Sequence, residues 1–444
     1  MTVDLIGLIW MLVKLVVVVN VFLSLVPVLV WLERRGSAFI QDRLGPNRTN
    51  IFGFKVFGII QNVADVLKFL LKEDFRPAAA DRIMFNLGPW LVFLPAVLVV
   101  IVIPFADAVT FGGRTYSFQV ADLDAGLLFI LAIASLGVFG FIMSGWGSNN
   151  KFSLLGAMRS SAQMISYEVT LGLSVVGILM IYGTYNSVSS FELNHLIRAQ
   201  GEMIEVFGLF SIPKWGIIVQ PLGFILFLVA SYAETNRLPF DMPEDEAALV
   251  AGYHTEYGGM KFAVFFMSEY VSMVTASCLV VILFFGGWQI PWAPTELLRN
   301  HAGAVARILV ALVGLHLLGG AILFHHLVSH EKHLYGIKPE HRKITDPLKK
   351  IGVYLMGIGG IVVLALVFAV PAQLEGLIGS IVVALAQIGA FGAKVAFFLF
   401  LYVWVRWTIP RFRYDQVMRL GWKMMMPLAL VNILITGAVS LALS

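Results

Sequence analysis

The stretch AETNRLPFDMPEDE, residues 233–246, lies between two long apolar segments of the chain. It contains six ionisable side chains, of which five are acidic. A lipid bilayer tolerates such a cluster only where it meets water or lines a path that protein encloses. The stretch therefore predicts an acidic loop at a membrane boundary, and its composition suits proton or quinone traffic better than simple anchoring.

The composition places almost the whole chain in a membrane. Of its 444 residues, 59% are hydrophobic and 13% are charged, and the mean hydropathy of +0.86 is too high for a soluble domain. Ten apolar runs are long enough to cross about 30 Å of hydrocarbon as helices. They cover residues 5–32, 83–105, 124–146, 160–182, 216–233, 262–286, 304–328, 351–371, 376–405 and 421–443. The sequence predicts an all-α polytopic membrane protein with about ten transmembrane helices.

Residue usage excludes several kinds of cofactor. The single cysteine, Cys278, excludes disulfide bonds and an iron–sulfur cluster held by this chain alone. No glycine-rich nucleotide-binding loop stands between a strand and a helix. We therefore expect nucleotide and iron–sulfur chemistry, if any, in partner chains. The first apolar run lacks a basic start and a small-residue cleavage site, so we expect it to be retained as a span.

The distribution of basic residues predicts an orientation. Of the 31 lysines and arginines, 24 fall in the segments 33–82, 147–159, 234–261, 329–350 and 406–423. Because basic residues accumulate in cytoplasmic loops, these segments are expected inside and both termini outside. In the first loop, Gln61, Asp65, Lys68 and Lys72 recur at helical spacing and predict an amphipathic helix at the membrane surface. The opposite segments 106–123 and 183–215 are expected to be loops with short helices.

The first cytoplasmic loop reads ERRGSAFIQDRLGPNR, residues 33–48. One interpretation is structural, because carboxylates and arginines often mark the end of a span. The other is a quinone site, in which arginines donate hydrogen bonds to the headgroup carbonyls and apolar neighbours contact the tail. The Gly45-Pro46 turn favours a defined backbone path.

Six stretches together resemble one family. They are residues 33–48 and 234–246, then GWGSNNKF (145–152), RSSAQMISYE (159–168), RWTIPRFRYDQ (406–416) and GWK (421–423). In type and order they are similar to the ND1/NuoH family, the membrane subunit of respiratory complex I that joins its hydrophilic arm to its membrane arm. The resemblance covers roughly residues 1–290 and 385–444.

The chain departs from that family in one place. Family members usually have eight spans, and about two more are inserted here at roughly 293–375, around a basic linker. We therefore divide the chain into a membrane core (1–290), an inserted hairpin (293–375) and a C-terminal two-helix part of the core (376–444). The hairpin is expected to face lipid or to dock an accessory subunit. Although His326, His330 and His333 share a helical face, without a further ligand we predict no metal site.

Ionisable residues within the spans carry a second signal. A membrane carboxylate costs about 2.5–3.5 kcal/mol to insert, so Glu168, Glu234, Glu269 and Lys394 should face water or a partner group. Static ion pairs between helices are the alternative, and for Glu269 and Lys394 the two interpretations are evenly balanced.

The resemblance implies two sets of functional residues. In the family a quinone enters a tunnel in this subunit, and the residues expected to line or frame it are Glu33, Arg34, Arg35, Phe39, Gln41, Arg43, Asp65 and Lys68. Coupling of quinone chemistry to proton movement is expected from Glu168, Glu234, Arg237, Asp241, Glu244, Glu246, Glu256, Glu269 and Lys394. No catalytic residue is expected in this chain.

The function that the resemblance implies is that of a coupling subunit without a redox centre in a proton-translocating NADH:quinone oxidoreductase. FMN and iron–sulfur clusters would belong to hydrophilic partner subunits, and quinone would be the substrate. Other partners would be small and antiporter-like membrane subunits and the lipid bilayer of a bacterial inner or plasma membrane, with no nucleic acid. The equivalent subunit of a membrane hydrogenase or another quinone-linked dehydrogenase is the alternative, and a free-standing ion transporter is less favoured.

Overall fold

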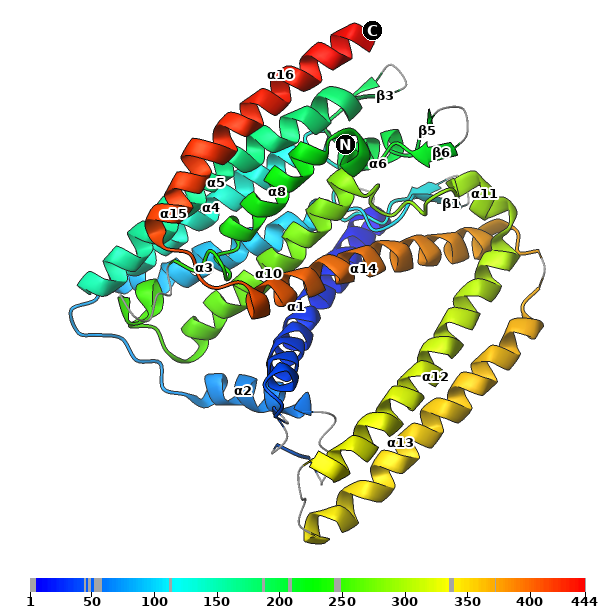
Figure 1. Cartoon of the computed structure of the whole chain (residues 1–444), viewed down its shortest axis with the longest axis horizontal. Helices are drawn as coiled ribbons and strands as arrows, with labels where there is room; N and C mark the ends of the chain where they lie inside the picture. The colour runs from blue at the N-terminus through cyan, green and yellow to red at the C-terminus, as the bar shows by residue number, and fades with distance from the viewer. Residues whose placement is uncertain are drawn as a thin grey trace.

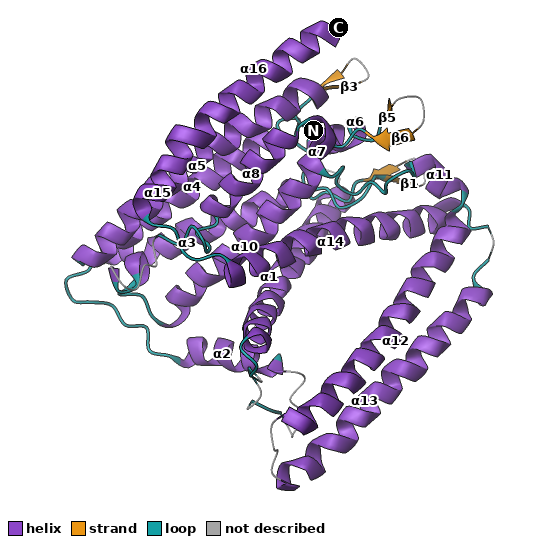
Figure 2. Cartoon of the chain, in the orientation of Figure 1, coloured by secondary structure: helices purple, strands orange, loops and turns teal. Residues whose placement is uncertain are grey.

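The computed structural model of the chain describes residues 5–43, 45–46, 49–51, 58–111, 114–185, 188–206, 210–242, 249–334, 339–371 and 373–443. In these residues nine helical segments are long and apolar enough to cross a membrane, and a tenth, α8 (Pro221–Glu234), is shorter. The long helices are α1 (Leu5–Ile40), α3 (Arg82–Leu98), α4 (Gly126–Gly147), α5 (Lys151–Tyr182), α10 (Gly259–Phe284), α12 (Ala302–Leu334), α13 (Pro339–Leu366), α14 (Gly376–Thr408) and α16 (Met426–Leu443). The prediction of an all-α polytopic membrane protein is confirmed (Figures 1 and 2).

Helix α10 occupies the middle of the bundle. Almost its whole length from Ala263 to Phe284 is buried, and it contacts α1, α3, α8 and α14. Close approaches of backbone position the surrounding helices. A side chain at Gly140 in α4 would meet Val92 of α3, and one at Gly147 would meet Met84. Small residues at such crossings allow helices to pack tightly in a membrane.

The fifth span is divided into two helical pieces. Helix α7 (Gly216–Val219) ends at Gln220, and α8 begins at Pro221. The break has a local cause, because proline disfavours helical geometry in the residue before it and provides no backbone N–H. The buried Gln220 side chain also bonds two residues of α16, accepting from Asn432 at 2.8 Å and donating to Thr436.

The segment predicted to be inserted forms a hairpin at one side of the bundle (Figure 1). Its two helices, α12 and α13, cross where Gly314 approaches Gly360, and α12 also contacts α14. Helix α13 turns an apolar face outward, with Leu355 and Ile361 more than half exposed. A helix of this composition at the edge of a bundle faces lipid or a partner helix.

The segments expected to be loops with short helices contain strands as well. Three antiparallel pairs form on the same side as both termini, and a short helix, α6 (Leu193–Ala199), lies among them. The strands are β1 (Val109–Phe111) with β2 (Arg114–Tyr116), β3 (Thr184–Tyr185) with β4 (Val188–Ser189), and β5 (Met203–Val206) with β6 (Phe210–Pro213). Runs of two to four residues are too short to show strand alternation in the sequence, which is why they were missed.

The first loop begins later than expected. Helix α1 continues through Glu33, Arg34 and Arg35 to Ile40, so these residues lie on a helix and not in a loop. The chain leaves the helix at Asp42, whose φ of 53° is left-handed, and turns again at Gly45. The expected amphipathic helix is α2 (Ile60–Leu71), which lies across the inner end of α1 (Figure 1). Here "inner" denotes the side predicted to be cytoplasmic.

Candidate functional site

Two carboxylates and two arginines meet inside the inner half of the bundle, and we call these four residues the inner charge cluster. Glu33 of α1 accepts a hydrogen bond from Arg237 at 2.5 Å and pairs with Arg406 of α14. Arg237 also lies 3.7 Å from Glu269 of α10. The side chains of Arg237 and Glu269 are only 7% and 8% exposed, so their charges interact in a medium of low polarity.

Two tyrosines complete the partners of the cluster. The Tyr270 hydroxyl donates to Glu33 at 2.9 Å, and the Tyr270 ring lies 4.3 Å from the Arg237 guanidinium. The Tyr253 hydroxyl donates to Glu269 at 3.1 Å. Buried charges require such partners, because removing one member leaves the other without compensation. The arrangement can hold a negative charge, or lose it to a proton, at a defined place in the protein.

The sequence around Arg237 bends to reach this position. Asn236 adopts a left-handed φ of 50°, and Gln163 of α5 donates to the carbonyl of Ala233 at 2.7 Å and to Asn236 at 3.1 Å. Asn236 in turn lies within 3.3 Å of the Ser160 hydroxyl. Residues 159–168 therefore hold the turn that carries Arg237, which is a physical reason for two of the family motifs to occur together.

The acidic segment next meets the segment 406–416. Arg411 donates to Asp241 at 2.8 Å, and the Phe240 ring packs between Tyr167 and Phe412 at centroid distances of 5.5 and 5.4 Å. Tyr167 donates to the carbonyl of Val417 in α15 (Tyr414–Arg419) at 2.8 Å. The segment is thus held on two sides as far as Met242. Two residues of the predicted coupling set, Glu244 and Glu246, lie outside the described residues.

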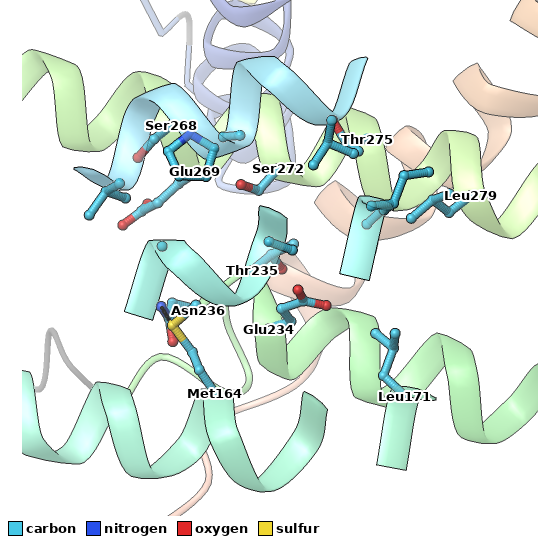
Figure 3. A pocket seen from close by; sticks show the side chains of 18 of the residues that line it. Met164, Leu171, Glu234, Thr235, Asn236, Ser268, Glu269, Ser272, Thr275 and Leu279 are labelled. Atoms are coloured by element: carbon cyan, nitrogen blue, oxygen red, sulfur yellow. Dashed lines mark hydrogen bonds between the residues drawn. The ribbon is translucent and has the colours of Figure 1, made fainter. Parts of the chain in front are cut away.

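A cavity of about 80 Å³ extends from this cluster between α3, α4, α5, α8 and α10 (Figure 3). Glu269 and Glu234 both line it. Between them the wall presents hydroxyl and amide groups, which are those of Thr235, Asn236, Ser268, Ser272 and Thr275. Polar groups of this kind can order water between the two carboxyl groups. The cavity therefore provides a space through which protons could move.

Glu168 lies beyond the cavity on α5. It accepts a hydrogen bond from Ser135 of α4, and its charge acts on Glu234. Glu269 belongs to the inner charge cluster, Glu234 lines the same cavity as Glu269, and Glu168 is the neighbour of Glu234 on α5. The structure thus brings together three of the four ionisable residues that the sequence singled out within spans.

A second depression opens beside Glu33 at the inner end of α1. Its empty volume is about 590 Å³, and its lining residues are Glu33, Arg34, Ser37, Arg43, Gly45 and Pro46. Arg43 donates to Gln41 at 2.8 Å. Glu33 therefore belongs both to this depression and to the buried cluster behind it, which makes it the junction between the two predicted sets of residues.

Helix α2 joins this depression through Arg34. Arg34 pairs with Asp65, which also accepts from Gln61 at 3.1 Å and lies 3.8 Å from Lys68. Burial by itself raises the pKa of Asp65, but the hydrogen bonds from Arg34 and Gln61 and the nearby positive charges outweigh it, so the pKa lies below its ordinary value. Asp65 is accordingly a fixed anion that positions Arg34.

Other predicted residues lie apart from these groups. The buried Arg35 packs over the Phe39 ring at 4.9 Å. Glu256 accepts from Asn150 at 2.6 Å, near the turn between α4 and α5. Lys394 lies on the other side of the bundle, where its ammonium group donates to the carbonyls of Phe285, Gly287 and Gln289 at 2.8, 3.0 and 2.6 Å and faces the Trp215 ring at 4.5 Å.

Several residues of the site were not singled out from the sequence. Arg406 and Arg411 lie in the motif 406–416, but the sequence assigned them no function. Tyr253 and Tyr270 carried no sequence signal. One signal was available, because Ser268, Ser272 and Thr275 recur at intervals of four and three in an otherwise apolar helix. In the described part of the chain no three His, Cys, Asp or Glu side chains are arranged to hold a metal ion, and the side chains of His330 and His333 lie outside it.

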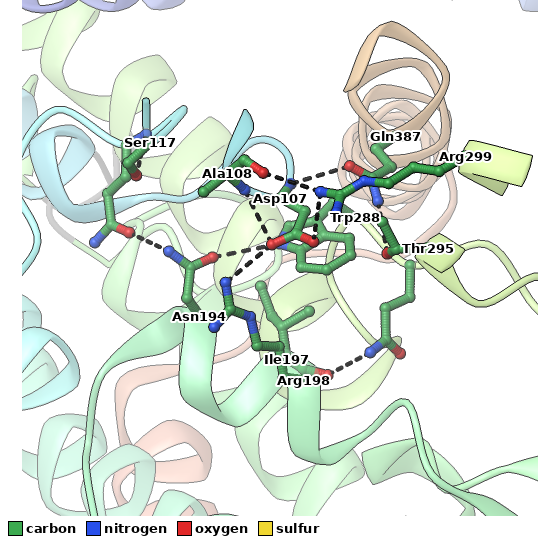
Figure 4. Close-up of polar contacts among 12 residues, drawn as sticks. Asp107, Ala108, Ser117, Asn194, Ile197, Arg198, Trp288, Thr295, Arg299 and Gln387 are labelled. Carbon is green, nitrogen blue, oxygen red and sulfur yellow. Dashed lines mark hydrogen bonds and ion pairs between the residues drawn. The ribbon is translucent and has the colours of Figure 1, made fainter. Parts of the chain in front are cut away.

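A second polar group lies on the outer side, and we call it the outer polar cluster (Figure 4). Asp107 pairs with Arg198 of α6 at 2.9 Å and with Arg299 of α11 (Thr295–Asn300) at 3.6 Å. Gln387 of α14 accepts from the Asp107 backbone and donates to Thr295 at 3.1 Å. These contacts tie α14 and the start of the hairpin to the core beside an open cavity of about 630 Å³.

The helices enclose a series of carboxyl groups that begins near the inner membrane face and continues into the bundle. This arrangement defines the chain as a polytopic membrane protein with charged groups inside the bilayer. A family model described as NADH dehydrogenase matches residues 13–437, so the chain belongs to that family. A protein of Bdellovibrio bacteriovorus, named as a subunit of NADH-quinone oxidoreductase, is 39% identical over 96% of this chain and 94% of its own length. A protein of Rhodothermus marinus named NADH-quinone oxidoreductase subunit 8 is 37% identical over 94% and 93%.

A third relative is covered to the same extent. A protein of Thermomicrobium roseum, again named as a subunit of NADH-quinone oxidoreductase, is 39% identical over an alignment of 425 residues. The alignment spans 96% of this chain and 94% of the relative.

Proposed function

We propose that this chain is the quinone-tunnel and coupling subunit of a proton-translocating NADH:quinone oxidoreductase, without a redox centre of its own. The observation that carries the proposal is the double position of Glu33. It lines the depression at the inner end of α1 and at the same time pairs with Arg237, which contacts Glu269 at the cavity. Family membership and the names of the relatives support the same function.

In this proposal the tunnel wall consists of the inner end of α1 and of α2. Arg34, Arg43 and Gln41 supply hydrogen-bond donors for the headgroup, and Phe39 supplies apolar surface for the tail. Arg35, Asp65 and Lys68 orient the wall through the contacts described above. The quinone headgroup would reach a hydrophilic partner subunit, where the flavin and iron–sulfur chemistry resides.

The coupling step follows from charge. Reduction of a quinone to a quinol takes up protons and changes the charge beside Glu33. Because Arg237 is shared by Glu33 and Glu269, a change at Glu33 alters the electrostatic balance at Glu269. Protons then redistribute through Glu269, Glu234 and Glu168 toward antiporter-like partners. Asp241 and Glu256 hold the segment at either end. Glu244 and Glu246 of the acidic loop are assigned to the same coupling set on the family resemblance alone.

The first test concerns the assembly. The chain is tagged, its native membranes are solubilised in mild detergent, and the partners that co-purify are identified while inhibitor-sensitive NADH:quinone reduction is assayed. We expect a flavin, iron–sulfur subunits and this activity. A hydrogenase arm would change the electron donor and contradict the NADH function, and recovery as a lone oligomer would contradict a subunit role altogether.

The second test concerns coupling. Glu234→Gln removes a protonatable group from the cavity while preserving its size, so quinone-coupled proton pumping should fall. Reduction of a hydrophilic acceptor by the flavin arm should stay at the wild-type rate, because that reaction does not use this chain. Glu296→Gln, an exposed carboxylate in α11, is the matched control and should pump normally. Wild-type pumping in an assembled Glu234→Gln complex would refute the coupling role.

A further inference from the structure

Helix α2 contacts the bundle through polar groups and through Phe69. Most of its other large apolar residues point outward, with Val63, Val66 and Leu70 between 50% and 56% exposed and Leu71 85% exposed. In a membrane this face rests in the interface between headgroups and acyl chains. Lipid contact alone fixes the depth of such a helix but lets it slide and rotate in the membrane plane, so its position must come from the protein side.

One residue of α2 is buried, and it is Asn62. Its side-chain amide donates to the backbone carbonyl of Pro27 in α1 at 2.6 Å. Pro27 interrupts the hydrogen-bond ladder of α1, because proline has no N–H and its ring displaces the preceding turn. The carbonyl that loses its helical donor is that of Leu23, four residues earlier, whereas the Pro27 carbonyl has a second lone pair that can accept a further bond. Asn62 supplies that further bond and so joins α2 to α1 directly after the interruption.

Two further contacts of α2 depend on this position. One helical turn after Asn62, Asp65 pairs with Arg34, a lining residue of the depression beside Glu33. Two turns after it, the Phe69 ring lies 6.0 Å from Phe262 of α10. If the Asn62 contact is lost, α2 can shift and carry Asp65 away from Arg34, which moves the wall of the depression.

We propose that Asn62 is a positioning residue that sets the mouth of the quinone path by fixing α2 on α1 at Pro27. This rests on the proposed function, since it assigns Asn62 a part in quinone access. A long, branched tail must pass the mouth along its whole length, whereas a short tail clears it quickly. The loss of the anchor should therefore affect long-tailed quinones more than short-tailed ones.

The test compares isosteric variants in the assembled complex. Asn62→Leu preserves the size of the side chain and cannot donate to the carbonyl, whereas Asn62→Asp can donate only in its protonated form and should lose the contact at high pH. We expect the KM for a long-tailed quinone to change by about 2- to 12-fold, the range that loss of one buried hydrogen bond produces. We expect kcat and the KM for a short-tailed quinone to stay near wild type. Asn62→Gln, which keeps the amide donor, should recover part of the effect.

Two controls separate the possible failures. Lys72→Gln, at the exposed end of α2, should leave both KM values unchanged. Hydrogen exchange of residues 59–73 reports on the anchor without any quinone, and it should be faster in Asn62→Leu. Unchanged exchange would refute the anchor, and faster exchange with equal effects on both quinones would refute its role at the mouth. A wild-type complex without quinone reductase activity would instead refute the proposed function.

Discussion

The inner charge cluster and the outer polar cluster contain the same types of charged residue but differ in how these residues are solvated and paired. In the inner cluster Glu33 and Glu269 share the guanidinium of Arg237, whose side chain is 7% exposed. Glu33 lines the depression at the inner end of α1, and Glu269 lines the cavity between the helices. In the outer cluster one carboxylate serves two arginines that are 53% and 44% exposed, and it also accepts a hydrogen bond from the backbone N–H of Ala108 at 2.9 Å. Water solvates the outer charges, whereas the inner charges depend on one another.

The difference shows how function and architecture can be told apart in this bundle. A buried group whose charge is balanced by a partner that it shares with another buried charge responds strongly to a change beside it. A solvated pair is screened and changes little when a neighbour changes. The inner cluster is therefore suited to transmit a change of charge, and the outer cluster is suited to hold helices together.

The largest expected effect comes from removing the shared arginine. Arg237→Ala leaves Glu33 and Glu269 buried without their common partner, which should cost about 3–5 kcal/mol of stability. Arg299→Ala in the outer cluster leaves Asp107 paired with Arg198 and should cost about 0.2–1 kcal/mol. Thermal unfolding and quinone reductase activity of the purified complex measure both. Equal losses in the two variants would remove the distinction between the clusters.

An intermediate effect is expected at Lys394. Its ammonium group binds three carbonyls at the end of α10, so Lys394→Met should leave them without donors and cost about 1–3 kcal/mol. Lys394→Arg should retain part of the stability. If Lys394 acts only as a clamp, the number of protons pumped per electron stays constant in both variants. A lower number in a fully assembled Lys394→Met complex would place this residue in the proton path after all.

The smallest effect is a pH dependence on the outer side. Burial and the neighbouring Asp122 carboxyl raise the pKa of Glu192 from 4.5 to about 7, while Arg198 and Asn194 oppose the shift. The folded state therefore binds this proton more tightly than the unfolded state, and stability should fall as the pH rises from 4.5 through 7. Glu192→Gln should flatten the dependence of the unfolding temperature on pH over this range. An unchanged slope would mean that other groups cause it.

The sequence predicted the inner site more completely than the outer one. Glu33, Arg237 and Glu269 stand out because charges are rare in apolar helices, and the motifs around the first two are long. The partners Arg406 and Tyr270 could not be assigned, because nothing in a single sequence shows which side chains meet across the bundle. Asp107, Arg198 and Arg299 gave no signal, since charged residues in outer loops are ordinary.

Hydrophobic runs, prolines and basic residues by themselves determined that this is a helical membrane protein, where its spans lie and which motifs flank them, because each of these features acts over one or two helical turns. Only the tertiary structure decided that Glu33 pairs with Arg237, 204 positions away, that Lys394 binds the end of α10, and that Asn62 is the buried residue of α2. Such pairings depend on how helices cross, and crossing is set by packing between distant segments rather than by local periodicity.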